Sequence, residues 1–101
     1  MRYKWLMLAA IGAGAIGLAA SGADAKVGQR CGGTIQITCG PGEWCDPTPG
    51  HCKPGARGHC VKIPEICPFD VVPVCGCNGQ TFSNNCFRIK DKVAEKHKGK
   101  C

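Results

Sequence analysis

Ten cysteines lie between Cys31 and the last residue, Cys101, and they constrain the fold more than any other feature of the chain. An even number of cysteines in so short a segment indicates five disulfides. A chain of this size buries too little apolar surface to depend on core packing alone, so bridges must replace part of the core. Because disulfides persist in oxidising compartments, we expect a secreted protein, extracellular or periplasmic.

The start of the chain has the pattern of a secretory signal peptide. Arg2 and Lys4 supply a positive region, residues 6–20 are apolar or glycine, and Ala23-Asp24-Ala25 fits the small-x-small cleavage motif. A membrane anchor is the alternative, but this apolar run of 15 residues is shorter than the roughly 20 that span a bilayer. We therefore expect residues 1–25 to be removed and the mature chain to have no membrane attachment.

Metal binding is the alternative use of the cysteines, with His51, His59 and His97 as further ligands. The sequence has no pair of Cys-x-x-Cys units, although a single glycine separates Cys75 from Cys77. Structural zinc sites are typically built from such pairs, and an oxidising compartment favours disulfides over thiolate ligands. We therefore expect no metal and no cofactor.

Residues 31–52 are predicted to form a small cysteine-rich knot. They contain four cysteines, five glycines and three prolines, a density of helix breakers that excludes a helix. Residues 34–38 alternate, Thr-Ile-Gln-Ile-Thr, which favours one short strand. Four cysteines allow three pairings. The pairs that we favour are Cys31 with Cys45 and Cys39 with Cys52.

Residues 53–59 are predicted to be a linker, because they contain no apolar side chain larger than alanine. Three of these seven residues are proline or glycine. The expected organisation is a signal peptide over residues 1–25, an N-terminal cysteine-rich module with its linker over 26–59, and a second module over 60–101.

The N-terminal module is faintly similar to the fungal cellulose-binding knot, which also has Cys-Gly-Gly followed by further cysteines and a glycine-rich turn. That family stacks a flat row of aromatic rings on sugar, whereas this module has only Trp44. A single ring offers little stacking area. We therefore expect a structural or spacer role, with carbohydrate binding through Trp44 as a minor alternative.

The segment that follows Cys67 carries the clearest local signals of the chain. Pro68 and Pro73 each remove a backbone donor and favour extended backbone in the residue before them. This predicts a stretched, exposed loop over residues 68–73. Asn78-Gly79 is the strongest short-range hairpin signal, so a small hairpin is expected after the loop.

A short helix is expected after the hairpin. Ser83 and Asn84 are both good N-cap residues, which places the start of the helix just before Cys86. Three apolar side chains nearby have no polar group that needs a partner. The side chains predicted to fill the small core are Phe82, Phe87 and Ile89.

This order of loop, hairpin, helix and cysteines resembles the Kazal family of serine protease inhibitors over residues 60–101. Spacings of eight positions from Cys67 to Cys75 and eleven from Cys75 to Cys86 are the family's own. The resemblance implies a small disulfide-rich fold: a Kazal-like α+β module, with a short helix packed on a small antiparallel sheet, preceded here by the cysteine-rich knot. The matching residues are Cys67, Pro73-Val74-Cys75-Gly76, Asn78-Gly79, Thr81-Phe82, Asn84, Cys86 and Gly99-Lys100-Cys101.

The resemblance also implies the disulfides of the second module. The expected pairs are Cys67 with Cys86, Cys75 with Cys101, and Cys60 with Cys77. The last pair departs from the family, because the usual fifth cysteine would fall at Ile89 and Cys77 takes its place. This departure affects the placement of the segment around Cys60, but not the loop.

In inhibitors of this family, the residue two positions after the cysteine that matches Cys67 enters the primary specificity pocket of the protease. Here that residue is Phe69, and the implied reactive bond joins Phe69 to Asp70. A large aromatic side chain suits the deep apolar pocket of chymotrypsin-like and subtilisin-like enzymes, but not that of trypsin. The expected reactive loop comprises Cys67, Pro68, Phe69, Asp70 and Val71, supported by Asn84 and Thr81.

The alternative function is a non-inhibitory, secreted Kazal-like binding or structural module. Pro68 replaces the threonine that often precedes the pocket residue, and the loss of that hydroxyl could weaken the loop. Proline also fixes one backbone angle, so the loop can keep its stiffness by another route.

Other classes of function find little support in the mature chain. It has one serine, Ser83, and no expected free thiol, so we predict that the protein is not an enzyme. Without residues 1–25 the chain keeps eleven Lys or Arg and six Asp or Glu, a net charge of +5. The basic residues after Cys86 lack interleaved aromatic residues, which predicts a solvated face and no nucleic-acid partner. No feature indicates oligomerisation, so we expect a monomer.

Overall fold

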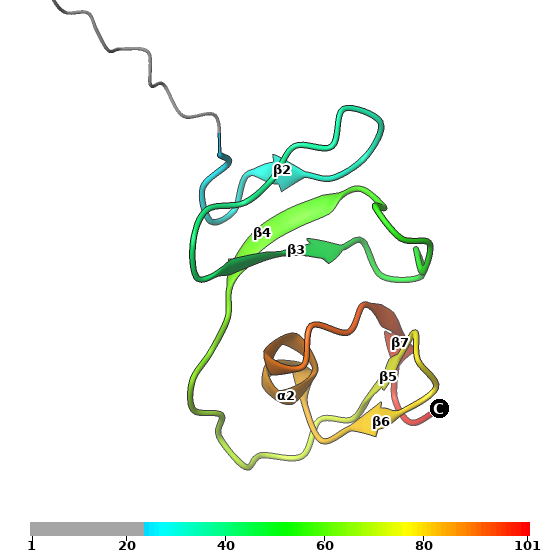
Figure 1. Cartoon of the computed structure of the whole chain (residues 1–101). Helices are drawn as coiled ribbons and strands as arrows, with labels where there is room; N and C mark the ends of the chain where they lie inside the picture. Colours follow the sequence, from blue (N-terminus) through cyan, green and yellow to red (C-terminus); the bar gives the residue numbers. More distant parts are fainter. Residues whose placement is uncertain (1–23) are drawn as a thin grey trace, which may run out of the picture.

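The computed structural model describes residues 24–101, which form two small antiparallel sheets and a short helix (Figure 1). The first sheet has the strand order β2-β4-β3, and the second has the order β6-β5-β7. The predicted signal peptide lies almost wholly outside the described residues. Within residues 24–101, no helix is long and apolar enough to cross a membrane. The elements are β2 Arg30–Cys31, β3 Glu43–Pro47, β4 Gly58–Lys62, β5 Val74–Gly76, β6 Thr81–Phe82, α2 Asn85–Lys90 and β7 Glu95–Lys98.

Five disulfides connect all ten cysteines. Three of them match the predicted pairs: Cys31–Cys45, Cys67–Cys86 and Cys75–Cys101. The other two predictions, Cys39 with Cys52 and Cys60 with Cys77, are wrong. The structure pairs Cys39 with Cys60 and Cys52 with Cys77.

The position of strand β4 explains why both of these disulfides differ from the prediction. It is antiparallel to β3 along its whole length, with Cys60 directly opposite Cys45. This register buries Cys60 in the first sheet at 1% exposure, where it bonds to Cys39. Cys52 is then available to reach Cys77 beside the second sheet. The boundary predicted between residues 59 and 60 consequently falls inside β4.

The strand predicted over residues 34–38 is wrong. Residues 33–36 form a turn in which Gln36 has a φ of 55° and donates its backbone N–H to the carbonyl oxygen of Gly33 at 3.1 Å, and Ile37 makes an isolated bridge to Gly32. Gly32 and Gly33 also have positive φ, which glycine adopts without steric cost. The chain therefore bends where a strand would need extended backbone, and Ile35 is left 79% exposed.

The hairpin and the helix form where the local signals predict them. β5 and β6 are antiparallel neighbours joined through Asn78-Gly79, and Gly79 has the positive φ, 85°, that such a turn requires. Helix α2 begins at Asn85, with Asn84 as its N-cap. The first turn of the helix is thereby fixed in place next to the hairpin.

The interior of the described chain is small, and much of it is sulfur. Of the three predicted core side chains, Phe82 is buried, whereas Phe87 and Ile89 are only half-buried. The buried residue of α2 is instead Arg88. The buried apolar residues are Ala25, Cys31, Cys60, Cys67, Val74, Cys75 and Phe82.

Candidate functional site

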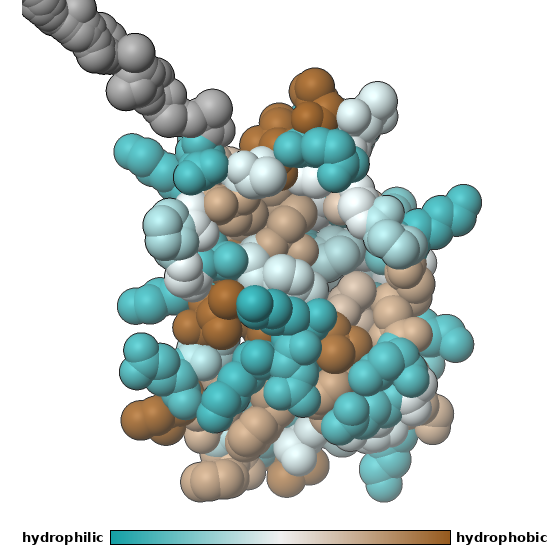
Figure 2. All heavy atoms as spheres, viewed as in Figure 1, coloured by the Kyte–Doolittle hydropathy of each residue, from teal (hydrophilic) through white to brown (hydrophobic). Residues whose placement is uncertain are grey.

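An extended segment leads from β4 to β5 around the outside of α2 (Figure 1). Its apolar side chains project into solvent: Ile66 and Phe69 are each 88% exposed, Val71 is 74% exposed and Val72 is 61% exposed. In Figure 2, brown and tan side chains appear at the lower end of the molecule, where this segment runs. Several exposed apolar side chains on one segment are typical of a surface that binds another molecule.

Residues 67–73, which we call the binding loop, are fixed to the body of the protein at both ends. Cys67 is bonded to Cys86 in α2, with 5.6 Å between the two Cα atoms. The Val72 N–H donates to the carbonyl oxygen of Ser83 at 2.8 Å. The Gly99 N–H donates to the carbonyl oxygen of Pro73, also at 2.8 Å. The exposed part of the loop is therefore a short span between covalent and hydrogen-bonded anchors.

The Asn84 side chain connects the middle of the binding loop to the helix. Its amide nitrogen donates to the carbonyl oxygens of Pro68 at 3.1 Å and Asp70 at 2.8 Å. Its side-chain oxygen accepts the Phe87 N–H at 3.3 Å and so caps α2. Asn84 is 5% exposed, which protects these hydrogen bonds from competition by water. Because the two carbonyl groups lie on either side of the Phe69–Asp70 peptide bond, this bond is held from both sides.

The Phe69 side chain lies at the surface, where it touches the protein mainly through one ring. Its ring centroid lies 6.2 Å from that of Phe87, and the two planes are inclined by 39°. This is a weak aromatic contact, and 88% of Phe69 stays exposed. A pocket on another molecule can therefore take up almost the whole ring.

The predicted support residue Thr81 acts at the C-terminus. Its hydroxyl oxygen accepts the Cys101 N–H at 3.0 Å. Cys101 is in turn bonded to Cys75 in β5, the strand that follows the binding loop. Thr81 thus reinforces the bridge behind the loop, while Asn84 makes the direct contact with the loop.

The residues considered as metal ligands or as a sugar-binding ring are poorly arranged for those functions. The sulfur atoms of Cys31, Cys39 and Cys60 lie within 4.8 Å of one another, but all three belong to disulfides and offer no thiolate. Trp44 is half-buried on β3, opposite Val61, so only part of its ring could stack on a sugar.

A small, disulfide-held body that presents an extended and braced loop has the geometry of a rigid, substrate-like ligand for a protease active site. Comparison with known families matches residues 52–101 to the Kazal-type serine protease inhibitor domain, and this half of the chain belongs to that family. The match begins at Cys52, the cysteine that is bonded to Cys77. No solved structure matches the chain.

Proposed function

We propose that the protein is a secreted inhibitor of chymotrypsin-like or subtilisin-like serine proteases, and that Phe69 enters their primary specificity pocket. The Kazal-type domain supports serine protease inhibition in general. The observation that carries the finer assignment is the pair of hydrogen bonds from Asn84 to the Pro68 and Asp70 carbonyl groups. These bonds immobilise the peptide bond that the protease would attack. A single binding loop in a monomer is expected to engage one protease.

Rigidity is the physical basis of the proposed inhibition. The loop backbone would lie along the enzyme cleft like an added strand, so that main-chain hydrogen bonds supply affinity without depending on most side chains. A free peptide loses much of this gain when it is ordered. The binding loop is already ordered by the Cys67–Cys86 bridge and by Asn84, so it loses little.

The same anchors would slow release after attack. When the serine of the protease attacks the Phe69 carbonyl carbon, the bond to the Asp70 nitrogen breaks and an acyl-enzyme forms. The Asp70 amine then stays close, because Asn84 holds the Asp70 carbonyl and the neighbouring backbone is fixed at Val72. The amine can therefore attack the acyl-enzyme and re-form the peptide bond, so that resealing competes with release.

Titration of the oxidised protein against chymotrypsin, subtilisin and trypsin tests this proposal. We expect stoichiometric inhibition of chymotrypsin or subtilisin, because Phe69 offers an exposed apolar ring. We expect no inhibition of trypsin, whose pocket carries a carboxylate that selects cations. A protein that inhibits none of the three at micromolar concentration would instead be a passive Kazal-like module.

Secretion is proposed on two observations. The first 25 residues carry the signal-peptide motif, and all ten cysteines of the chain are oxidised to disulfides. Disulfides of this number persist in extracellular or periplasmic space.

Substitution of Asn84 separates its two roles. Asn84→Asp keeps an oxygen that can accept the Phe87 N–H, but it can no longer donate to the two loop carbonyl groups. Asn84→Ala removes the cap as well. Since the two lost hydrogen bonds cost about 1–3 kcal/mol each, we expect both variants to raise the inhibition constant by at least roughly thirtyfold. If Asn84→Asp inhibits as well as the parent protein, the loop does not depend on these bonds.

A further inference from the structure

Helix α2 buries a cation in place of an apolar side chain. Arg88 is 2% exposed, whereas Phe87 and Ile89 on either side of it are half-buried. A helix of six residues is not stable by itself, so its position depends on its tertiary links, which are the Cys67–Cys86 bridge and the contacts of its buried side chain. A buried guanidinium group needs a counter-ion and further hydrogen-bond acceptors.

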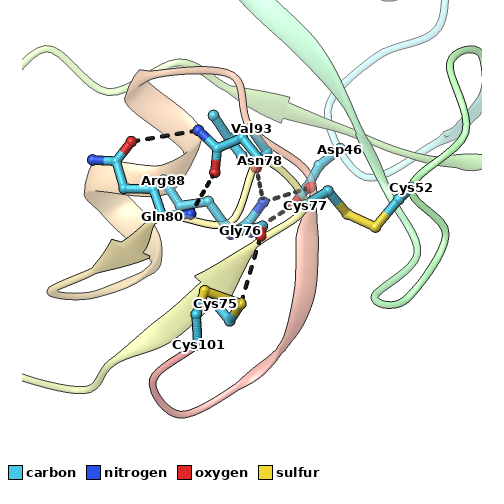
Figure 3. Close-up of a disulfide and its surroundings, with 10 residues drawn as sticks. All are labelled: Asp46, Cys52, Cys75, Gly76, Cys77, Asn78, Gln80, Arg88, Val93 and Cys101. Carbon is cyan, nitrogen blue, oxygen red and sulfur yellow. Dashed lines mark hydrogen bonds and ion pairs between the residues drawn. A yellow bond between two sulfur atoms is a disulfide. The ribbon is translucent and has the colours of Figure 1, made fainter.

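The counter-ion comes from the first sheet, β2-β4-β3, which is the N-terminal sheet. Arg88 Nη1 and Nη2 donate to the two carboxylate oxygens of Asp46 in β3, at 2.9 and 3.0 Å (Figure 3). Nη1 also donates to the carbonyl oxygen of Val93, and Nε donates to Asn85 Oδ1, both at 2.8 Å. Glu95 Oε1 lies 4.0 Å from Nη2. A two-point pairing of arginine with carboxylate fixes the orientation of the two groups as well as their distance.

Two other links join the N-terminal module to the second module, but neither of them ends on α2. The Cys52–Cys77 bridge ends just after β5 (Figure 3). The Gly50 N–H donates to the carbonyl oxygen of Glu95 in β7 at 2.9 Å. Both links hold the second sheet, whereas the Asp46 carboxylate holds α2. The Asp46–Arg88 pair is thus the connection that bears on the position of the helix.

The position of the helix bears in turn on the binding loop. Asn85, which holds Arg88 Nε, directly follows Asn84, which holds the Pro68 and Asp70 carbonyl groups. The first turn of α2 therefore lies between the hydrogen bonds to the loop and the ion pair to the N-terminal sheet. If the ion pair is lost, this turn keeps its bridge through Cys86 but loses the contact that fixes its orientation, and the Asn84 amide shifts with it.

We propose that Asp46 is a positioning residue of the inhibitor: through Arg88 it holds α2, and through α2 it holds Asn84 against the binding loop. The N-terminal cysteine-rich module is then part of the scaffold that keeps the loop rigid, and not a spacer. The consequence for inhibition rests on the proposed function, whereas the consequence for loop rigidity does not.

Amide hydrogen exchange of the full-length oxidised protein tests the proposal without any protease. In Asp46→Asn, the amides of Val72 and Phe87, which report on the loop and on the helix cap, should exchange at least tenfold faster than in the parent. The amide of Cys60, bonded to Gln29 within the N-terminal module, should stay within twofold of the parent. Asp91→Asn is the matched control, because it removes the same charge from an exposed residue at the end of the same helix. It should change none of these rates.

A second variant and an inhibition assay complete the test. Asp46→Glu keeps the charge but cannot keep the same two-point geometry. Its Val72 and Phe87 amides should therefore exchange at rates between those of the parent and those of Asp46→Asn. If Asp46→Asn fails to form its five disulfides, Asp46→Glu alone carries the test. In that variant the exchange rates of the Val72 and Phe87 amides should rise at least threefold. Against the protease that the parent inhibits, Asp46→Asn should show a tenfold higher inhibition constant and a tenfold faster cleavage of the Phe69–Asp70 bond.

Two results would overturn the proposal. One is unchanged exchange at Val72 and Phe87 in both Asp46 variants. The other is an exchange rate that rises as much at the Cys60 amide as at Val72 and Phe87. Such a result would mean a general loss of stability without a specific effect on the loop. If the parent inhibits no protease but the exchange rates change as expected, the proposed function fails while the positioning role of Asp46 stands.

Discussion

Phe69→Gly is expected to abolish measurable inhibition of chymotrypsin-like and subtilisin-like proteases. The Phe69 ring is 88% exposed in the free protein, so nearly all of its burial would take place in the complex. Truncation of a central aromatic side chain at an interface costs about 4 kcal/mol, which is roughly a thousandfold in the inhibition constant. The measurement is a titration of each protease with the parent and the variant under identical conditions.

The fold should tolerate this substitution, because Phe69 makes only a weak contact with Phe87 and contributes little to the core. Ile35→Gly is the matched control: Ile35 is 79% exposed, but it lies in the N-terminal module. This control should inhibit as the parent does. A Phe69→Gly protein that inhibits as well as the parent would show that Phe69 is not the pocket residue.

Removal of the Cys67–Cys86 bridge, by Cys67→Ala together with Cys86→Ala, is expected to convert the inhibitor into a substrate. The bridge spans 19 positions of sequence, and closing a loop of this size stabilises a protein by about 3 kcal/mol. Without it, one end of the binding loop is released and the Asp70 amine can leave the acyl-enzyme. We expect cleavage at Phe69–Asp70 to become at least a hundredfold faster, as measured by mass spectrometry over time.

The control for this variant removes a bridge of similar span from the N-terminal module, which bears on the loop only indirectly, through Asp46 and Arg88. Cys31→Ala with Cys45→Ala opens a link of 14 positions within the N-terminal module. It should lower the thermal midpoint, yet leave cleavage at Phe69–Asp70 much slower than in the Cys67/Cys86 variant. Equal resistance of the Cys67/Cys86 variant and the parent to cleavage would contradict the role given to this bridge.

The parts of the fold that depend on neighbouring residues could be predicted from the sequence. Pro68 and Pro73 predict the extended loop, Asn78-Gly79 predicts the hairpin, and Asn84 predicts the start of the helix. Each of these signals acts within a few residues, where backbone sterics and side-chain caps decide the conformation. That Asn84 supports the loop could be expected only from the family resemblance, since the carbonyl groups that accept its hydrogen bonds lie 14 and 16 positions away.

Strand β4 and the two disulfides that depend on it could not be predicted in the same way. Residues 53–59 have the composition of a linker, yet Gly58 begins a strand that pairs with β3. A Cβ at Gly58 would overlap the Asp46 carbonyl oxygen, so this glycine permits a close approach of two backbones. A single glycine is a weak signal of such an approach, and it does not identify the partner strand.

The pairing of Asp46 with Arg88 could not be predicted from local sequence patterns either. The two residues are 42 positions apart, and no periodicity connects them. The apolar residues Phe87 and Ile89 were the natural candidates for the buried face of the helix, because an isolated arginine is rarely buried. Only the fold brings Asp46 close enough to neutralise Arg88 and make its burial possible.

The most direct test of the account is the equilibrium between the intact protein and the protein cut at Phe69–Asp70. Both forms are incubated separately with a catalytic amount of the inhibited protease, and the products are identified by mass spectrometry. A braced loop predicts cleavage at this one bond, and re-formation of intact protein from the cut form until both samples reach the same ratio. Cleavage at other bonds, or a cut form that never reseals, would contradict it.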